Sequence, residues 1–243
     1  MSGHSKWSTI KRKKAATDAA RGKAFTKVIK EITISARDGG GDPASNPRLR
    51  LAIQNAKVAN MPQDNITRAI KKGTGELEGV RYEEVNYEAY ASHGIALFIE
   101  CVTDNKNRTV ADLRHALTKY NGHLGENGSV SWMFDRKGVI TIEKGAHTEE
   151  ELMETILDVG AEDLKDEDSY FEVISSLETF ENVRKAIEEK GFKIENASLQ
   201  YLAKDLVQLK EKEANNVIKC IEAVDNNEDV QNVYTNADFI TDD

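Results

Sequence analysis

The sequence is poor in cysteine and proline, and it contains no long apolar run. Its two cysteines, Cys101 and Cys220, stand far apart, which excludes a disulfide framework and a cysteine-rich zinc site. Both lie among apolar residues and are predicted to be small core side chains. No stretch approaches the ~18 consecutive apolar residues of a membrane span, and the N-terminus lacks the apolar segment of a secretory signal. We therefore expect no membrane span and no export signal.

The motifs of several common enzyme classes are also missing. There is no P-loop, no G-x-S-x-G and no H-E-x-x-H sequence. His115 and His123 have no third ligand at a suitable spacing, so no metal site is predicted. The acidic runs 149–151 and 166–168 are explained by a helix start and by solvation rather than by a general acid and base. We expect no enzyme activity, no cofactor and no small-molecule substrate.

Charge is distributed unevenly along the chain. Residues 1–75 hold 16 lysines and arginines against 5 aspartates and glutamates, a net charge of +11. Residues 76–243 hold 17 against 37, a net charge of −20, so the overall charge of −9 conceals the split. A basic segment on an acidic body is typical of polyanion-binding proteins, because one part attracts phosphates while the rest repels nonspecific contacts. The alternative is that the lysines only solvate exposed helices.

The basic segment carries three stretches with apolar residues at helical spacing. Glycine, asparagine and proline separate these stretches, as is typical of helix ends and helix starts. We therefore predict a small three-helix domain that follows a polar arm of residues 1–16. The separating residues are Gly39–Gly41, Asn46, Pro47, Pro62 and Gly73.

Beyond residue 75 the pattern alternates between strands and helices, which predicts an α+β fold. Residues 138–202 alone read strand, helix, strand, helix, strand, so they form a self-sufficient unit. We predict three domains: a small helical N-terminal domain and two α/β sandwich-like domains, one inserted in the other. Their predicted bounds are residues 1–75, residues 76–134 with 205–243, and residues 135–204.

Two local predictions concern the body. Residues 129–134 are expected to form a strand that a turn at 135–138 ends. A helix is expected over residues 110–120, with Thr109 and Asp112 forming a capping box at its start.

The cations of the basic segment gather on helix faces opposite the apolar residues. These outward faces are predicted to contact phosphates. In the arm, lysines and an arginine surround Trp7, which either stacks on a base or anchors the arm to the body. The candidate nucleic-acid-binding residues are Lys6, Trp7, Lys11, Arg12, Lys13, Lys14, Lys23, Lys27, Lys30, Arg48, Arg50, Lys57, Arg68, Lys71, Lys72 and Arg108.

Two loops leave alternatives open. Residues 103–109 form a dense polar loop in which Arg108 is required neither by the turn nor by the helix cap. This arginine either belongs to a structural turn or contacts phosphate or a partner. The glycine-rich stretch 122–129 could approach a phosphate, but it follows a helix instead of opening one, which favours a helix-to-strand turn.

No groove-reading motif is evident in the helical segment. A seven-residue glycine-rich link, residues 39–45, joins two of the helices, so the compact turn of a helix-turn-helix is not expected. Patterns of an RNA-recognition motif or a KH domain are not convincing either.

Short strings along the whole chain closely resemble the YebC/PmpR family, which includes the mitochondrial translational activator of cytochrome c oxidase. They occur in the same order from end to end, which makes the resemblance specific. One departure is Ala91–Gly94, where the family usually has a Gly-Pro-Gly-type turn. The matching strings are Gly3–Trp7, Gly40–Pro43, Asn46–Arg50, Asn60–Pro62, Arg68–Ile70, Thr103–Asn105, Asn107–Thr109, Gly122–Gly125, Gly128–Val130 and Asp229–Gln231.

The resemblance implies a three-domain, cytoplasmic, non-enzymatic regulator of gene expression that binds nucleic acid. Members of the family are described as DNA-binding transcriptional regulators and as translation factors acting at the ribosome or on messenger RNA. Both roles use polyanion binding, so charge alone does not separate them. The family's usual naming favours DNA, while the missing compact turn favours RNA, with the ribosome as a further candidate partner.

Overall fold

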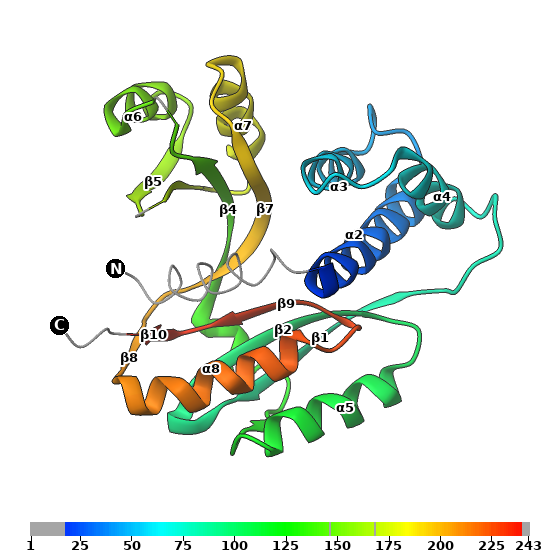
Figure 1. Ribbon diagram of the computed structural model, residues 1–243, viewed down its shortest axis with the longest axis vertical. Coiled ribbons are helices and arrows are strands. Elements are labelled where there is room, and N and C mark those ends of the chain that lie inside the picture. Colours follow the sequence, from blue (N-terminus) through cyan, green and yellow to red (C-terminus); the bar gives the residue numbers. More distant parts are fainter. Residues whose placement is uncertain (1–17, 146, 168, 240–243) are drawn as a thin grey trace. The chain divides into compact units, whose positions relative to one another are not determined.

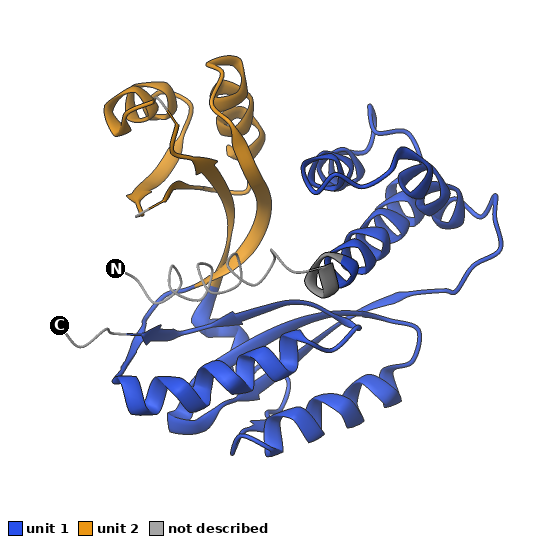
Figure 2. Cartoon of the chain, in the orientation of Figure 1, with its two compact units in different colours: residues 1–134, 203–243 blue, residues 135–202 orange. Residues whose placement is uncertain are grey.

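The computed structural model describes residues 18–145, 147–167 and 169–239 (Figure 1). The chain divides into two compact units, one of residues 1–134 with 203–243 and one of residues 135–202 (Figure 2). A helical region precedes two four-stranded sheets that are each accompanied by helices, which confirms the predicted α+β class. Within the described ranges, no helix has the length and apolar character needed to cross a membrane.

From residue 18, where the description starts, the first unit has a helical region in which three helices pack together. Their apolar faces form one buried cluster that includes Ile32, Leu49 and Ile66. The end of the third helix approaches the first so closely that a Cβ on Gly73 would lie 2.3 Å from the carbonyl oxygen of Thr33. The helices are α2 (Asp18–Gly39), α3 (Pro47–Val58) and α4 (Gln63–Gly73).

Asn46 joins α2 to α3 by capping both helices. Its side-chain oxygen accepts a hydrogen bond from the Leu49 amide at 3.0 Å, and its side-chain nitrogen donates to the carbonyls of Ser35 and Gly40 at 2.7 and 2.9 Å. The predicted helix start at Asn46 and Pro47 is therefore confirmed.

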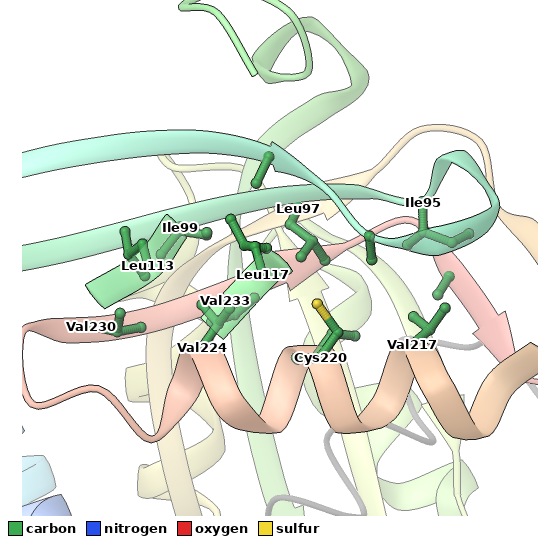
Figure 3. Close-up of a cluster of buried hydrophobic side chains, with 14 of the residues drawn as sticks. Ile95, Leu97, Ile99, Leu113, Leu117, Val217, Cys220, Val224, Val230 and Val233 are labelled. Atoms are coloured by element: carbon green, nitrogen blue, oxygen red, sulfur yellow. The ribbon is translucent and has the colours of Figure 1, made fainter. Parts of the chain in front are cut away.

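The first unit continues with a four-stranded sheet in the order β3-β1-β2-β9, whose β1-β2, β1-β3 and β2-β9 pairs are all antiparallel. The helices α5 and α8 pack their apolar residues against it (Figure 3). Parallel strands β8 and β10 form a separate pair. The elements are β1 (Glu83–Tyr90), β2 (Ala96–Thr103), α5 (Lys106–Thr118), β3 (His123–Leu124), β8 (Val207–Leu209), α8 (Glu211–Asp225), β9 (Val230–Thr235) and β10 (Ala237–Phe239).

Both cysteines lie in the apolar cluster between this sheet and its helices, as predicted. Burial raises the pKa of Cys101 to about 12 and the pKa of Cys220 to about 11. The thiols are therefore protonated, inert core groups near neutral pH.

The second unit is a sheet in the order β5-β6-β4-β7, accompanied by two helices. The pairs β4-β6 and β5-β6 are antiparallel. The elements are β4 (Phe134–Glu143), α6 (Glu149–Leu157), β5 (Ala161–Asp166), β6 (Tyr170–Ser175), α7 (Phe180–Glu189) and β7 (Ile194–Ala203).

Two local predictions are wrong. Residues 131–133 form a short 3-10 helix, and β4 runs from Phe134 straight through the predicted turn at 135–138. The pairing of β4 with β6 covers Gly138 to Glu143. The helix α5 begins at Lys106 and is capped by Asn105, whose side chain accepts from the Arg108 amide. Thr109 therefore lies inside the helix and is fully buried.

Candidate nucleic-acid interface

The candidate residues of the arm, Lys6, Trp7, Lys11, Arg12, Lys13 and Lys14, lie outside the described residues. The remaining candidates lie on α2, α3, α4 and α5 of the first unit. The structure divides them into cations that contact side chains elsewhere in the first unit and cations for which no such contact occurs among the described residues.

The lysines of α2 do face away from the helical core, but they face the segment 225–229 that joins α8 to β9. Lys23 Nζ donates to Asn226 Oδ1 at 3.0 Å. Lys27 Nζ forms an ion pair with Asp225 Oδ1 at 2.9 Å and also donates to the Asp225 carbonyl. The predicted outward face is therefore covered by another part of the same unit.

Lys30 is the most buried of these cations. Its Nζ donates to Asp229 Oδ1 at 3.0 Å and to the carbonyls of Glu228 and Val102 at 2.8 and 3.0 Å. The residue is 5% exposed, so the prediction that it projects into solvent is wrong. The spacing correctly placed Lys30 on the side of α2 that faces away from the helical core. It does not reveal that residues of β2 and of the segment 225–229 pack against that side.

Asp229 is the centre of a polar cluster made of Asp229, Lys30, Thr103, Arg108 and Thr109, here called the Asp229 cluster. The hydroxyls of Thr103 and Thr109 donate to its Oδ2 at 3.1 and 2.8 Å, and Arg108 Nη2 donates to both carboxylate oxygens. Burial alone would raise the pKa of Asp229, but the donors from Arg108, Lys30 and Thr109 outweigh it and hold that pKa below its usual value.

The Asp229 cluster shows that Arg108 has a structural role in the loop 103–109. Arg108 Nη2 also contacts Asp104 Oδ1 at 2.7 Å, so one nitrogen serves two carboxylates. The loop is therefore a structural joint between β2, α5 and β9. The Arg108 side chain nevertheless stays 47% exposed, which leaves its outer edge accessible to an anion.

Arg48 on α3 also has acidic partners. Its Nε lies 2.7 Å from Glu31 Oε1, and its Nη2 contacts Glu84 on β1. Burial opposes the charge of Arg48, but the hydrogen bonds to Glu31 and Glu84 outweigh burial and raise its pKa above the ordinary value. This arginine links the helical region to β1, and its charge is largely compensated.

Five other candidate cations on α3 and α4 have no carboxylate partner among the described residues. Arg50 Nη1 donates only to the carbonyls of Pro43 and Ala44, at 2.9 and 3.2 Å. Together with Lys57, Arg50 borders a shallow hollow floored by Ile53 and Gln54. Arg68, Lys71 and Lys72 are exposed on α4. We call Arg50, Lys57, Arg68, Lys71 and Lys72 the unpaired cations.

The link between α3 and α4 is short, contrary to the expectation that a compact turn is missing. Only residues 59–62 separate the two helices, and Asn60 adopts a positive φ of 58°. The Met61 amide donates to the Ala56 carbonyl and the Asn60 amide to that of Lys57, which is the Schellman arrangement. A four-residue turn of this kind is typical of helix-turn-helix motifs.

The glycine-rich stretch 122–129 holds an anion from within the chain. The carboxylate of Glu88 accepts hydrogen bonds from the amides of Gly128, Val130 and Ser131 at 2.6, 2.5 and 2.8 Å. Within the stretch, the amides of Gly122, Gly125, Gly128 and Ser129 already donate to acceptors in the chain, which favours the helix-to-strand turn over a phosphate site.

The sequence did not reveal three acidic partners. Asp229 contacts Lys30, Glu88 contacts the Gly128 amide, and Glu31 contacts Arg48. Asp229 lies 199 residues from Lys30 along the chain, and Glu88 lies 40 residues from Gly128. No local spacing connects such pairs. The one available signal was that Asp229 falls in a string shared with the resembled family.

Comparison with known proteins agrees with the order of the elements. Residues 5–76 match a family described as the TACO1/YebC protein N-terminal domain, and residues 82–237 match one described as the TACO1/YebC second and third domain. The chain belongs to the TACO1/YebC family. The resemblance stated from the motifs is therefore confirmed.

Relatives in this family match over nearly their whole length. A protein of Prosthecochloris aestuarii named "Probable transcriptional regulatory protein" is 57% identical over 240 residues, covering 98% of this chain and 96% of the relative. One of Geobacter sulfurreducens with the same description is 54% identical over 241 residues, covering 99% and 97%. A crystal structure of a conserved hypothetical protein from Aquifex aeolicus has a TM-score of 0.87 at 44% identity, covering 93% of each chain.

Proposed function

We propose that this chain is a non-enzymatic, cytoplasmic regulator of gene expression that binds nucleic acid through its helical region, with DNA as the physiological target. The names of the TACO1/YebC relatives support a role in transcription. The set of unpaired cations on α3 and α4 is the observation that carries the binding proposal.

The unpaired cations are suited to phosphate contacts because nothing else in the first unit's described part compensates them. Neutralising Z phosphates releases condensed counterions, so each contact contributes to affinity and to its salt dependence. Arg108 contributes at most through its exposed edge, since Asp104 and Asp229 already share its Nη2.

The short turn between α3 and α4 favours DNA over RNA. In helix-turn-helix proteins the second helix lies in the major groove, and here α4 is the second helix and carries Arg68, Lys71 and Lys72. We therefore place α4 in the groove and the cations Arg50 and Lys57 of α3 along the backbone.

The binding proposal is tested by exchanging lysines for glutamines in pairs. Lys71→Gln with Lys72→Gln should weaken binding to a 20-base-pair duplex. The slope of log K against log salt should become shallower by about 0.9 for each lost phosphate contact on the duplex, and by about 0.7 for each on a single-stranded ligand. The matched control is Lys185→Gln with Lys190→Gln, which removes the same charge from an exposed surface of the second unit. Equal binding by the two double variants would refute the proposed surface.

The target is identified by crosslinking in cells followed by sequencing. Recovery of promoter DNA would support the transcriptional role. Recovery of ribosomal or messenger RNA, with no enrichment of DNA, would replace that role by a function in translation while leaving the unpaired cations as the binding surface.

A further inference from the structure

The three lysines of α2 meet a surface that offers oxygen acceptors to each of them. Lys27 and Lys30 contact carboxylates, and Lys23 contacts the neutral side chain and the carbonyl of Asn226. Lys23, Lys27 and Lys30 lie one helical turn apart, and each contacts a different part of the segment 225–229. That segment, here called the acidic loop, presents the carboxylates of Asp225 and Asp229 and several backbone carbonyls. A row of negative oxygens opposite a row of lysines is also how a phosphate backbone meets a basic helix.

The acidic loop owes part of its negative potential to the end of α8. Asp225 is the last residue of α8 and Asn226 is its C-cap, so their carbonyls carry the negative end of the helix dipole. Lys27 and Lys23 donate to these two carbonyls at 3.3 and 3.5 Å. Cations at such a position are favourable because the last carbonyls of a helix lack partners within it.

We propose that the acidic loop is an intramolecular mimic of the phosphate backbone that masks α2, so that nucleic acid gains the lysines of α2 only when the helical region separates from the loop. The inference rests on the proposed function and adds a regulatory step to it. In the masked form the chain binds through the unpaired cations of α3 and α4. In the open form Lys23, Lys27 and Lys30 join them.

Opening removes one of several partners from Asp229. When Lys30 departs, Asp229 keeps the guanidinium of Arg108 and the hydroxyls of Thr103 and Thr109. The carbonyls of Val102 and Glu228 lose the same lysine. Loss of one partner from a buried ion pair is unfavourable, so the open form is the minor form until phosphate oxygens replace the acceptors that the three lysines have left.

Masking lowers the apparent affinity because masked molecules bind through the unpaired cations alone. The additional contacts of Lys23, Lys27 and Lys30 are available only in the open form, so their contribution to the observed binding constant is reduced by the open fraction. A change that opens the mask should therefore tighten binding and steepen its salt dependence, because more lysines then meet phosphates.

The variant Asp225→Lys tests this directly. It places a cation against Lys27 and repels α2, while a lysine suits the C-terminal end of α8 and leaves that helix intact. The matched control is Glu189→Lys, which makes the same change of charge at the last residue of α7 in the second unit. Fluorescence anisotropy with a 20-base-pair DNA duplex and a 20-nucleotide RNA gives both affinities over a range of salt.

We expect Asp225→Lys to bind about 3-fold to 10-fold more tightly than Glu189→Lys, with a salt slope steeper by about 0.7–0.9 for each lysine released. Equal affinities and slopes for the two variants would overturn the mask while leaving the proposed function standing. Absence of binding by the wild-type chain and by both variants would overturn the proposed function and the mask together.

A covalent crosslink gives a second test, which does not require that the Asp225→Lys variant folds. Lys23→Cys with Asn226→Cys, bridged by a short bismaleimide, should hold α2 against the acidic loop. The bridged protein should bind more weakly than the same double variant capped with N-ethylmaleimide. Equal binding by the bridged and capped forms would contradict the mask.

Discussion

Removal of the negative charge of Glu88 should destabilise the turn that precedes β4. Glu88→Gln keeps the shape of the side chain but leaves one oxygen to serve three amides, those of Gly128, Val130 and Ser131. The new NH2 group faces at least one of these donors. Since Glu88 is only 8% exposed, water cannot readily replace the lost acceptor. Loss of one charged hydrogen bond and weakening of two others should lower the free energy of unfolding by about 2–4 kcal/mol.

Urea unfolding measured by Trp132 fluorescence reports this loss, because Trp132 follows the turn and its Nε1 donates to the Ser129 carbonyl. A Trp7→Phe background leaves Trp132 as the sole tryptophan. The control is Glu83→Gln on the same strand, whose exposed pairing with Lys106 is screened by solvent and should contribute little to stability. If Glu88→Gln were no more destabilising than Glu83→Gln, the account of the turn would be wrong.

The pH dependence gives an independent check of the same carboxylate. Burial would raise the pKa of Glu88, but the backbone donors outweigh it and hold the pKa below its usual value. A depressed pKa in the folded state means that the stabilisation is fully present above the unfolded value of about 4.3 and is lost as the pH falls below it. The stability difference between wild type and Glu88→Gln should therefore shrink as the pH is lowered through that region.

Substitutions at three further positions test other buried contacts, and the free energy of unfolding is measured for each with urea or heat. Thr109→Val should lower the free energy of unfolding by about 1–3 kcal/mol, because it removes a fully buried hydroxyl whose single proton serves Asp229 Oδ2 or the Asn105 carbonyl; a near-neutral result would mean that the Asp229 cluster tolerates its absence. Asn46→Ala should cost about 2–4 kcal/mol, since it removes a helix cap and leaves two carbonyls without donors, and Asn46→Asp should recover only the cap. Gly73→Ala should cost about 1–3 kcal/mol by pushing α4 away from Thr33, whereas Gly75→Ala, in open space but at a positive φ, measures backbone strain alone.

Local patterns along the chain were enough to identify the kinds of elements and much of their order. Apolar spacing located α2, α3 and α4, and Asn46 with Pro47 marked a helix start correctly, because caps and amphipathic faces are local properties of the chain. The alternation of strand-like and helix-like segments beyond residue 75 likewise indicated the α+β class of the body. The charge split indicated polyanion binding, and shared strings indicated the family.

Tertiary structure decided which of the predicted cations are available. The helical spacing correctly turned Lys27 and Lys30 away from the helical core, yet it could not show that the acidic loop, some 200 residues later in the chain, covers that face. The same holds for Arg48, whose partner Glu84 lies on a strand of the sheet. A lysine on a helix surface looks the same in sequence whether solvent, a carboxylate or a phosphate lies opposite, because the pairing of charges depends on which surfaces meet once the chain has folded.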